Sequence, residues 1–267
     1  MAMNQLRILV RGAGDIASGI AYRLCKSGFK RLCMTEVSQP LAVRRGVSFC
    51  EAIHDGEKSV EGVTAVFAGS FEQIQENWMR GKIPVVIDPG GGVIPFLRPE
   101  IVVDAILAKK NLGTRMSDAA LVIGIGPGFY AGRDTHSVIE SKRGHSLGRI
   151  IREGEADRDT GVPGIIEGYG AERVFRSPEG GAVTPLKRIG EHVEAGEKIA
   201  VVGDSPVEAQ IRGIIRGMIR EGTVVTKGVK IGDIDPRGIE EHCYTVSDKA
   251  LSIAGGVLEA ILDKYNS

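Results

Sequence analysis

A glycine motif near the amino terminus has the residue types of a dinucleotide site. Gly12 and Gly14 follow a short apolar run, Ala17 comes three residues later, and Glu36 stands 22 residues after Gly14. In such sites the first glycine makes a tight turn and the second lets the backbone approach a pyrophosphate. The small third residue packs helix on strand, and the acid accepts a hydrogen bond from a ribose hydroxyl. The spacing predicts cofactor binding by Gly12, Gly14, Ala17 and Glu36.

Asp15 weakens this interpretation, although we keep it among the candidate cofactor-binding residues. It stands where the following helix should begin, so its carboxylate would cap the amides that a phosphate needs and would repel the phosphate. The alternative is a Rossmann-like domain that binds no nucleotide.

Two further glycine-rich loops follow predicted strands. The first contains Asp88, Gly90 and Gly91, and the second contains Gly126 and Gly128. Open α/β sheets bind ligands at the carboxyl ends of their strands, so we expect both loops to meet the Gly12 loop at one crevice. The alternative interpretation is that these are ordinary tight turns.

A group of titratable residues follows the second of these loops. His136 and Glu140 are four residues apart, which would place them on one face of a helix, and His145 comes soon after. Such groups can serve acid–base catalysis, and these three are the catalytic candidates. They supply too few ligands in a defined geometry for a metal site, so none is predicted. Solvated or capping side chains are the alternative.

These motifs need a scaffold of alternating strands and helices. Short apolar runs predict strands at 6–10, 31–35, 62–67, 82–87 and 120–125, and helical spacing predicts helices after Gly14, at about 70–80 and at 99–111. This alternation is typical of a Rossmann-like, doubly wound parallel sheet over residues 1–126. Residues 127–172 form a glycine-rich connecting or site segment.

An internal repeat with an offset of 32 residues occupies 181–234. Each half contains the pattern G-x-x-V-x-x-G-x-K-I, in which glycines mark turns between short strands. We predict a duplicated, all-β barrel-sandwich hybrid over 173–236, resembling biotinyl and lipoyl carriers. The hairpin between the halves, 203–208, has no lysine, so no attached cofactor is expected. Residues 237–267 form the C-terminal segment, whose helix should run from its cap at Ser247 to Tyr265 and pack on the α/β domain.

Composition excludes several classes of function. The 34 Lys and Arg residues balance 34 Asp and Glu residues, which argues against a nucleic-acid binder. No apolar stretch has the length of a membrane span, and no signal peptide is recognisable. The four cysteines are scattered without metal-ligand spacing, so we expect a cytoplasmic protein.

Several motifs together resemble the YqeB family along essentially the whole chain. They include Arg11-Gly12-Ala13-Gly14-Asp15, Asp88-Pro89-Gly90-Gly91, the segment from Gly124 through Arg149, Gly232-Asp233-Ile234-Asp235-Pro236-Arg237 and Ser247-Asp248-Lys249-Ala250. The resemblance implies an accessory protein of a selenium-dependent molybdenum hydroxylase system with an NAD(P)-binding-like Rossmann fold. It offers no catalytic residues to transfer.

Two functions compete on these grounds. The first is a maturation factor that binds a molybdenum hydroxylase, or its maturation machinery, and a cofactor such as molybdopterin cytosine dinucleotide. The second is an NAD(P)-dependent oxidoreductase, for which His136 is the best available proton donor. A non-catalytic scaffold that uses the small β domain for partner docking is a third alternative. The sequence does not predict the oligomeric state.

Overall fold

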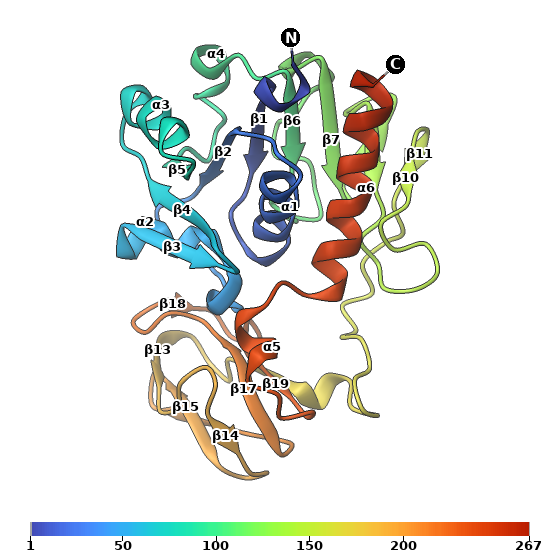
Figure 1. Cartoon of the computed structure of the whole chain (residues 1–267). Helices are drawn as coiled ribbons and strands as arrows, with labels where there is room; N and C mark the ends of the chain where they lie inside the picture. The colour runs from blue at the N-terminus through green and yellow to red at the C-terminus, as the bar shows by residue number, and fades with distance from the viewer. Residues whose placement is uncertain (1, 267) are drawn as a thin grey trace. The chain divides into compact units, whose positions relative to one another are not determined.

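The computed structural model describes residues 2–266, which divide into two compact units (Figure 1). The α/β unit comprises Ser48–Asp159 with the flanking ranges 2–40 and 246–266. The β unit comprises Leu41–Val47 and Thr160–Thr245. The predicted divisions at 126/127, 172/173 and 236/237 differ from these boundaries.

The α/β unit is built on a nine-stranded mixed sheet in the order β10-β9-β7-β6-β1-β2-β5-β4-β3. All the strands between the two edge strands of this sheet run parallel to one another. The edge strands β3 and β10 are antiparallel to their neighbours β4 and β9. The strands are β1 Arg7–Arg11, β2 Arg31–Glu36, β3 Glu57–Val60, β4 Val63–Phe67, β5 Ile83–Ile87, β6 Ile101–Asp104, β7 Leu121–Ile125, β9 Ser137–Ile139 and β10 Ile150–Ile151. A separate two-stranded sheet pairs β8 (Tyr130–Ala131) with β11 (Gly154–Glu155).

Helices cover this sheet because each has one apolar stripe to bury. Helix α1 packs along α6, which also contacts β7 and β9 (Figure 1). Ile74 of α3 and Leu97 of α4 pack in a cluster with strand residues such as Leu9. The helices are α1 Asp15–Lys26, α2 Ala52–Asp55, α3 Phe71–Met79, α4 Ile94–Leu97 and α6 Asp248–Tyr265, with 3-10 turns at η1 Met3–Gln5, η3 Phe49–Glu51 and η4 Met116–Asp118.

The prediction of a doubly wound parallel sheet is wrong, because the sheet is mixed. The predicted helix at 99–111 is instead led by β6, whose residues are fully buried beside β1. A short apolar run such as Ile101-Val102-Val103 fits either element by periodicity, and its β-branched residues favour the strand. Strand β3 was not predicted; it joins β4 through a two-residue turn in which Glu61 and Gly62 both have positive φ.

The β unit contains two separate four-stranded antiparallel sheets, β12-β19-β17-β14 and β16-β15-β13-β18. Its strands are β12 Val174–Arg176, β13 Gly181–Pro185, β14 His192–Val193, β15 Lys198–Val202, β16 Ser205–Glu208, β17 Gly213–Met218, β18 Val224–Val225 and β19 Lys230–Asp235; α5 is Glu241–Tyr244, and 3-10 turns lie at η2 Arg45–Val47 and η5 Ala171–Arg173. Two separate sheets replace the predicted barrel-sandwich hybrid, which is therefore also wrong.

The repeat is nevertheless visible in this unit. Strands β13, β14 and β15 recur 32 residues later as β17, β18 and β19. Strand β13 of the first half pairs with β18 of the second, and β17 of the second pairs with β14 of the first. Each sheet therefore takes strands from both halves, and one apolar cluster that includes Val183 and Ile215 fills the unit.

Candidate functional site

The predicted glycine loops all lie at the carboxyl edge of the large sheet. Strands β1, β2, β5, β6 and β7 are parallel neighbours, so the residues that follow them reach the same edge. This edge holds the turns after Arg11, Glu36, Ile87, Asp104 and Ile125.

The end of β2 and the turn after β1 are joined by a direct hydrogen bond. The Ala13 N–H donates to Glu36 Oε2 at 2.9 Å, and the Val37 N–H donates to Glu36 Oε1 at 2.9 Å. Each carboxylate oxygen keeps a free lone pair for a further donor. The structure therefore places the Glu36 carboxylate directly against the turn that follows β1.

The glycines of the predicted site differ in the space around them. Gly12 has φ of +94°, and a Cβ there would come within 2.9 Å of the Ala105 carbonyl oxygen. Gly128 has φ of +110° and would meet the Lys110 nitrogen at 2.6 Å, while a Cβ on Gly126 would collide with the Ser141 hydroxyl. These three glycines allow neighbouring loops to pack closely.

Gly14 and Gly90 have open space instead. A Cβ on either residue would have no atom of another residue within 4 Å apart from its chain neighbours. Gly14 is also the N-cap of α1, where no side chain caps the helix, and Asp15 occupies its first turn. Ala17 is buried within α1. Among the predicted cofactor-binding glycines, Gly14 is thus the one with open space at the end of a long helix.

The Asp88 loop is closed by its own side chain. Asp88 Oδ1 accepts from the Gly92 N–H at 2.9 Å and Oδ2 accepts from the Val93 N–H at 2.8 Å, just before α4. A Cβ on Gly91 would approach Ile94 at 3.2 Å. These contacts show that Asp88 and Gly91 stabilise the turn before α4.

A buried charged cluster beneath the loops was not predicted. The Arg11 side chain is only 2% exposed. Its Nη1 lies 3.5 Å from Asp104 Oδ2 and donates a hydrogen bond to the Thr114 hydroxyl. Its Nη2 donates to the Pro89 carbonyl at 3.3 Å. The Thr114 hydroxyl donates to Asp104 Oδ2 at 2.5 Å. Burial raises the pKa of Asp104, against the lowering effects of Thr114 and then Arg11. The sequence feature that could have indicated this cluster is that two apolar strands, β1 and β6, each end in a charged residue, Arg11 and Asp104.

Lys249, the second residue of α6, is a further group that the sequence did not single out. It is half-buried, and within residues 2–266 its ammonium has no hydrogen bond or ion pair. Burial and then Arg143 lower the pKa of Lys249. The negative charges of Asp15, Asp159 and Glu140 oppose this shift of the Lys249 pKa, and the helix that carries Lys249 packs along α1.

The three catalytic candidates are not brought together. His136 and Glu140 flank strand β9, so the predicted helical spacing is wrong and the two residues lie at opposite edges of the sheet. His136 Nδ1 accepts from the Val122 N–H at 2.9 Å, and burial lowers the pKa of its imidazole. Both Glu140 oxygens accept backbone N–H groups, from Lys142 and Asp157, and His145 is exposed beside Arg149.

Neither a metal centre nor a membrane span is found in the described part of the chain. Within residues 2–266, no three His, Cys, Asp or Glu side chains are grouped so that they could hold a metal ion. Over the same residues, every helix is too short or too polar to cross a bilayer.

Comparisons with known proteins give one strong relative. The chain is 48% identical over 255 residues to the Uncharacterized protein YqeB of Escherichia coli (strain K12), an alignment that covers 96% of this chain and 47% of that protein. The chain thus spans about half the length of the curated relative that it matches. No protein-family model matches it.

The similar solved structures are distant. The ectoine utilization protein EutE (DoeB) from Ruegeria pomeroyi has 10% identity and a TM-score of 0.26, covering 86% of both chains. An aspartoacylase family protein from Mesorhizobium loti has 14% identity and a TM-score of 0.28, covering 86% of this chain and 85% of that one. These scores are too low to transfer a fold or a function. The sequence relationship over nearly the whole chain is decisive instead, and by it the chain belongs to the YqeB family.

Proposed function

We propose that this chain binds a nucleotide-containing cofactor at the Gly12–Gly14 loop and serves as an accessory factor of a selenium-dependent molybdenum hydroxylase system. The observation that carries the binding proposal is the hydrogen bond from Ala13 to Glu36, together with the open space at Gly14. The accessory role rests on the family resemblance, and the partner is a molybdenum hydroxylase or its maturation machinery.

Different residues near this loop suit different chemical groups of such a cofactor. The N-terminus of α1, where the N-cap residue Gly14 has no side chain and open space around it, suits a pyrophosphate. Glu36 suits a ribose hydroxyl, and the Lys249 ammonium supplies a cation near the same helix end. Asp15 opposes the phosphate, and Lys249 offsets that charge. NAD(P) and molybdopterin cytosine dinucleotide share this diphosphate chemistry, and both are candidate cofactors.

The Gly14→Val variant provides the test. Gly14 has extended backbone torsions and no neighbour within 4 Å, so the protein should fold with valine there. We expect the valine side chain to fill the phosphate space and to weaken binding at least about tenfold. Native mass spectrometry of gently purified protein identifies the co-purifying nucleotide, and calorimetric titration with that nucleotide measures both proteins.

Gly255→Val is the matched control, because Gly255 is equally open and lies in α6, outside the predicted glycine loops. Weaker binding by Gly14→Val alone supports the Gly12–Gly14 loop as the phosphate site. Equal affinity of wild type and Gly14→Val, or purified protein that neither carries nor binds a nucleotide, contradicts the proposal.

A further inference from the structure

An apolar cavity lies where strands β4 and β5 end and helices α3 and α4 begin. It has a volume of about 510 Å³, within the range of pockets that hold small molecules. Large apolar side chains from all four elements line it: Phe67 of β4, Phe71 of α3, Ile87 of β5 and Phe96 of α4. The cavity adjoins the Asp88 loop, and its lining residues do not include the Gly12–Gly14 loop.

These apolar side chains are unusually open to solvent. Phe96 is 73% exposed, Ile87 is 45% exposed, and Phe67 and Phe71 are 37% exposed each. The Phe67 ring lies beside Gly69 of the cavity lining, since a Cβ on Gly69 would be 3.9 Å from Phe67 Cε1. Single exposed apolar residues are ordinary, but several that gather around one cavity mark a surface that binds something.

Asp88 is the only charged residue among those that line the cavity in the described part of the chain. Its two carboxylate oxygens accept the N–H groups of Gly92 and Val93, and each keeps a lone pair for a further donor. Within residues 2–266, no lysine, arginine or histidine forms an ion pair with Asp88. The positive end of α3 also borders the cavity, but Ser70 caps it and Glu72 lies in its first turn. The cavity therefore combines an apolar wall with a negative charge.

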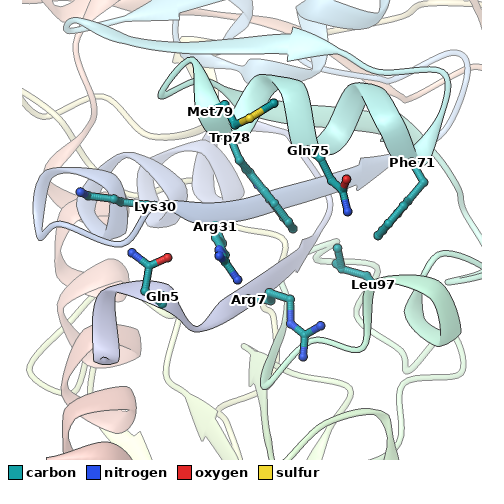
Figure 2. A pocket seen from close by; sticks show the side chains of 9 residues that line it. All are labelled: Gln5, Arg7, Lys30, Arg31, Phe71, Gln75, Trp78, Met79 and Leu97. Atoms are coloured by element: carbon teal, nitrogen blue, oxygen red, sulfur yellow. The ribbon is translucent and has the colours of Figure 1, made fainter. Parts of the chain in front are cut away.

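A second cavity of the same unit has the opposite charge. It lies between α3 and the starts of β1 and β2, and it shares Phe71 with the first cavity (Figure 2). Its charged lining residues are Arg7, Lys30 and Arg31, and no acidic residue lines it in the described part of the chain. An organic cation should therefore enter the first cavity and not the second.

We propose that the cavity at the ends of β4 and β5 binds an arylalkyl ammonium, an aromatic ring joined to a protonated amine by a short chain. The ammonium donates to the open lone pairs of the Asp88 carboxylate, which is a hydrogen bond between opposite charges. The ring packs among the phenylalanine rings, where stacked and edge-to-face contacts add to the burial of its apolar surface. This inference is independent of the nucleotide site proposed above.

Three ligands that share one ring and differ in charge test the site. Phenethylammonium is the cation, phenethyl alcohol is its neutral analogue and phenylacetate is its anionic analogue. Calorimetric titration of the full chain, with saturation-transfer NMR for the weaker ligands, should show saturable binding of the cation. The alcohol should bind at least about tenfold more weakly, because a hydrogen bond between charged groups is lost, and phenylacetate should bind more weakly still.

Variants separate the charge from the wall. Asp88→Asn should weaken the binding of phenethylammonium about tenfold or more and leave that of phenethyl alcohol unchanged, so the alcohol reports that the cavity is intact. Phe96→Ala should weaken the binding of both ligands at least about threefold, because ring contacts are lost. The controls are Asp263→Asn, which removes an exposed charge from α6, and Met79→Ala, which shortens an exposed apolar residue at the other end of α3. Both controls should bind the ligands like wild type, as should Gly14→Val.

Each outcome decides the matter. A preference for the cation that wild type shows and Asp88→Asn loses supports the site. Three results overturn it: equal or tighter binding of the alcohol or of phenylacetate by wild type, unchanged affinity of Asp88→Asn for phenethylammonium, or no binding of phenethylammonium by wild type at millimolar concentration. Thermal melting checks the fold of each variant, and Phe96→Ala tests the cavity without removing an acceptor from the Asp88 turn.

Discussion

At the scale of single residues, the structure separates side chains that complete a turn from side chains that remain available. Both oxygens of Asp88 and both oxygens of Glu140 accept backbone N–H groups, so their carboxylates hold loops in place. Lys249 has no such partner among residues 2–266. The sequence alone could not make this distinction, because it depends on which loop amides come within reach.

The Arg11–Asp104 pair is expected to contribute strongly to stability. Arg11→Met leaves the Asp104 carboxylate buried beside Thr114 without its cation, and breaking a buried pair in this way costs about 3–5 kcal/mol. Urea unfolding at neutral pH measures the loss. Lys82→Met breaks the exposed Lys82–Glu57 pair and should cost less than about 1 kcal/mol. Equal losses in the two variants would show that Asp104 is not held as a buried charge.

Lys249 should make stability depend on alkaline pH. Its pKa is lowered in the folded state, so the unfolded chain binds its proton more readily and folding becomes more favourable as pH rises toward the ordinary lysine pKa of about 10.4. Lys249→Met should be at least as stable as wild type at pH 7 and should lose this rise. Denaturant unfolding between pH 7 and 10 tests it, with the exposed Lys110→Met as control. If the unfolding free energies of wild type and Lys249→Met changed with pH in parallel, the lowered pKa of Lys249 in the folded protein would be contradicted.

At the scale of elements, sequence periodicity located most of the large sheet. Strands β1, β2, β4, β5 and β7 and helices α1, α3 and α6 fall where they were predicted, and Ser247 caps α6 by accepting from the Ala250 N–H at 3.2 Å. The wrong predictions have two physical causes, ambiguous periodicity in short strands and pairing between strands that are distant in sequence. Strand β6 is too short for its period to differ from that of a helix, and β9 was misread because His136 and Glu140 have a spacing that suits either element. The antiparallel edges depend on pairing between strands, which local pattern does not encode.

Adjacent glycines in α6 should respond oppositely to alanine. A Cβ on Gly255 meets no atom within 4 Å, so Gly255→Ala should stabilise the protein by about 0.5–1 kcal/mol through helix propensity. A Cβ on Gly256 would overlap the Gly148 carbonyl, so Gly256→Ala should destabilise by about 1–3 kcal/mol. Thermal and urea unfolding of the two variants compare them directly. Destabilisation by Gly255→Ala would mean that this face of α6 is covered.

At the scale of the whole molecule, the chain passes from one unit to the other after Pro40, Val47, Asp159 and Thr245. The short segment Leu41–Val47 therefore belongs to the β unit although it is far away in sequence. Val43 packs against the apolar cluster of that unit, and Arg45 Nε donates to the Met218 carbonyl at 2.8 Å. No local pattern in 41–47 predicts this role, because its partners lie more than 100 residues later.

The last prediction tests whether this segment holds the β unit closed. Arg44 is 6% exposed, and its Nη2 donates to the carbonyls of His242 at 2.7 Å and Thr245 at 3.1 Å, on either side of the buried Cys243. Arg44→Ala removes both hydrogen bonds at a cost of about 2 kcal/mol or more, so local opening around Cys243 should increase at least about tenfold.

Labelling by a thiol reagent, followed by peptide mass spectrometry, should accelerate at Cys243 while Cys33 and Cys50 of the α/β unit stay protected. Burial raises the pKa of the Cys243 thiol and Arg44 opposes this shift, so loss of Arg44 alone would slow labelling at fixed pH, and faster labelling can only report exposure. Arg212→Ala, a change at an exposed arginine 3.9 Å from Glu194, is the control and should leave all rates unchanged. If Cys243 labels no faster in Arg44→Ala, or if all three buried thiols accelerate together, then segment 41–47 does not stabilise the β unit locally.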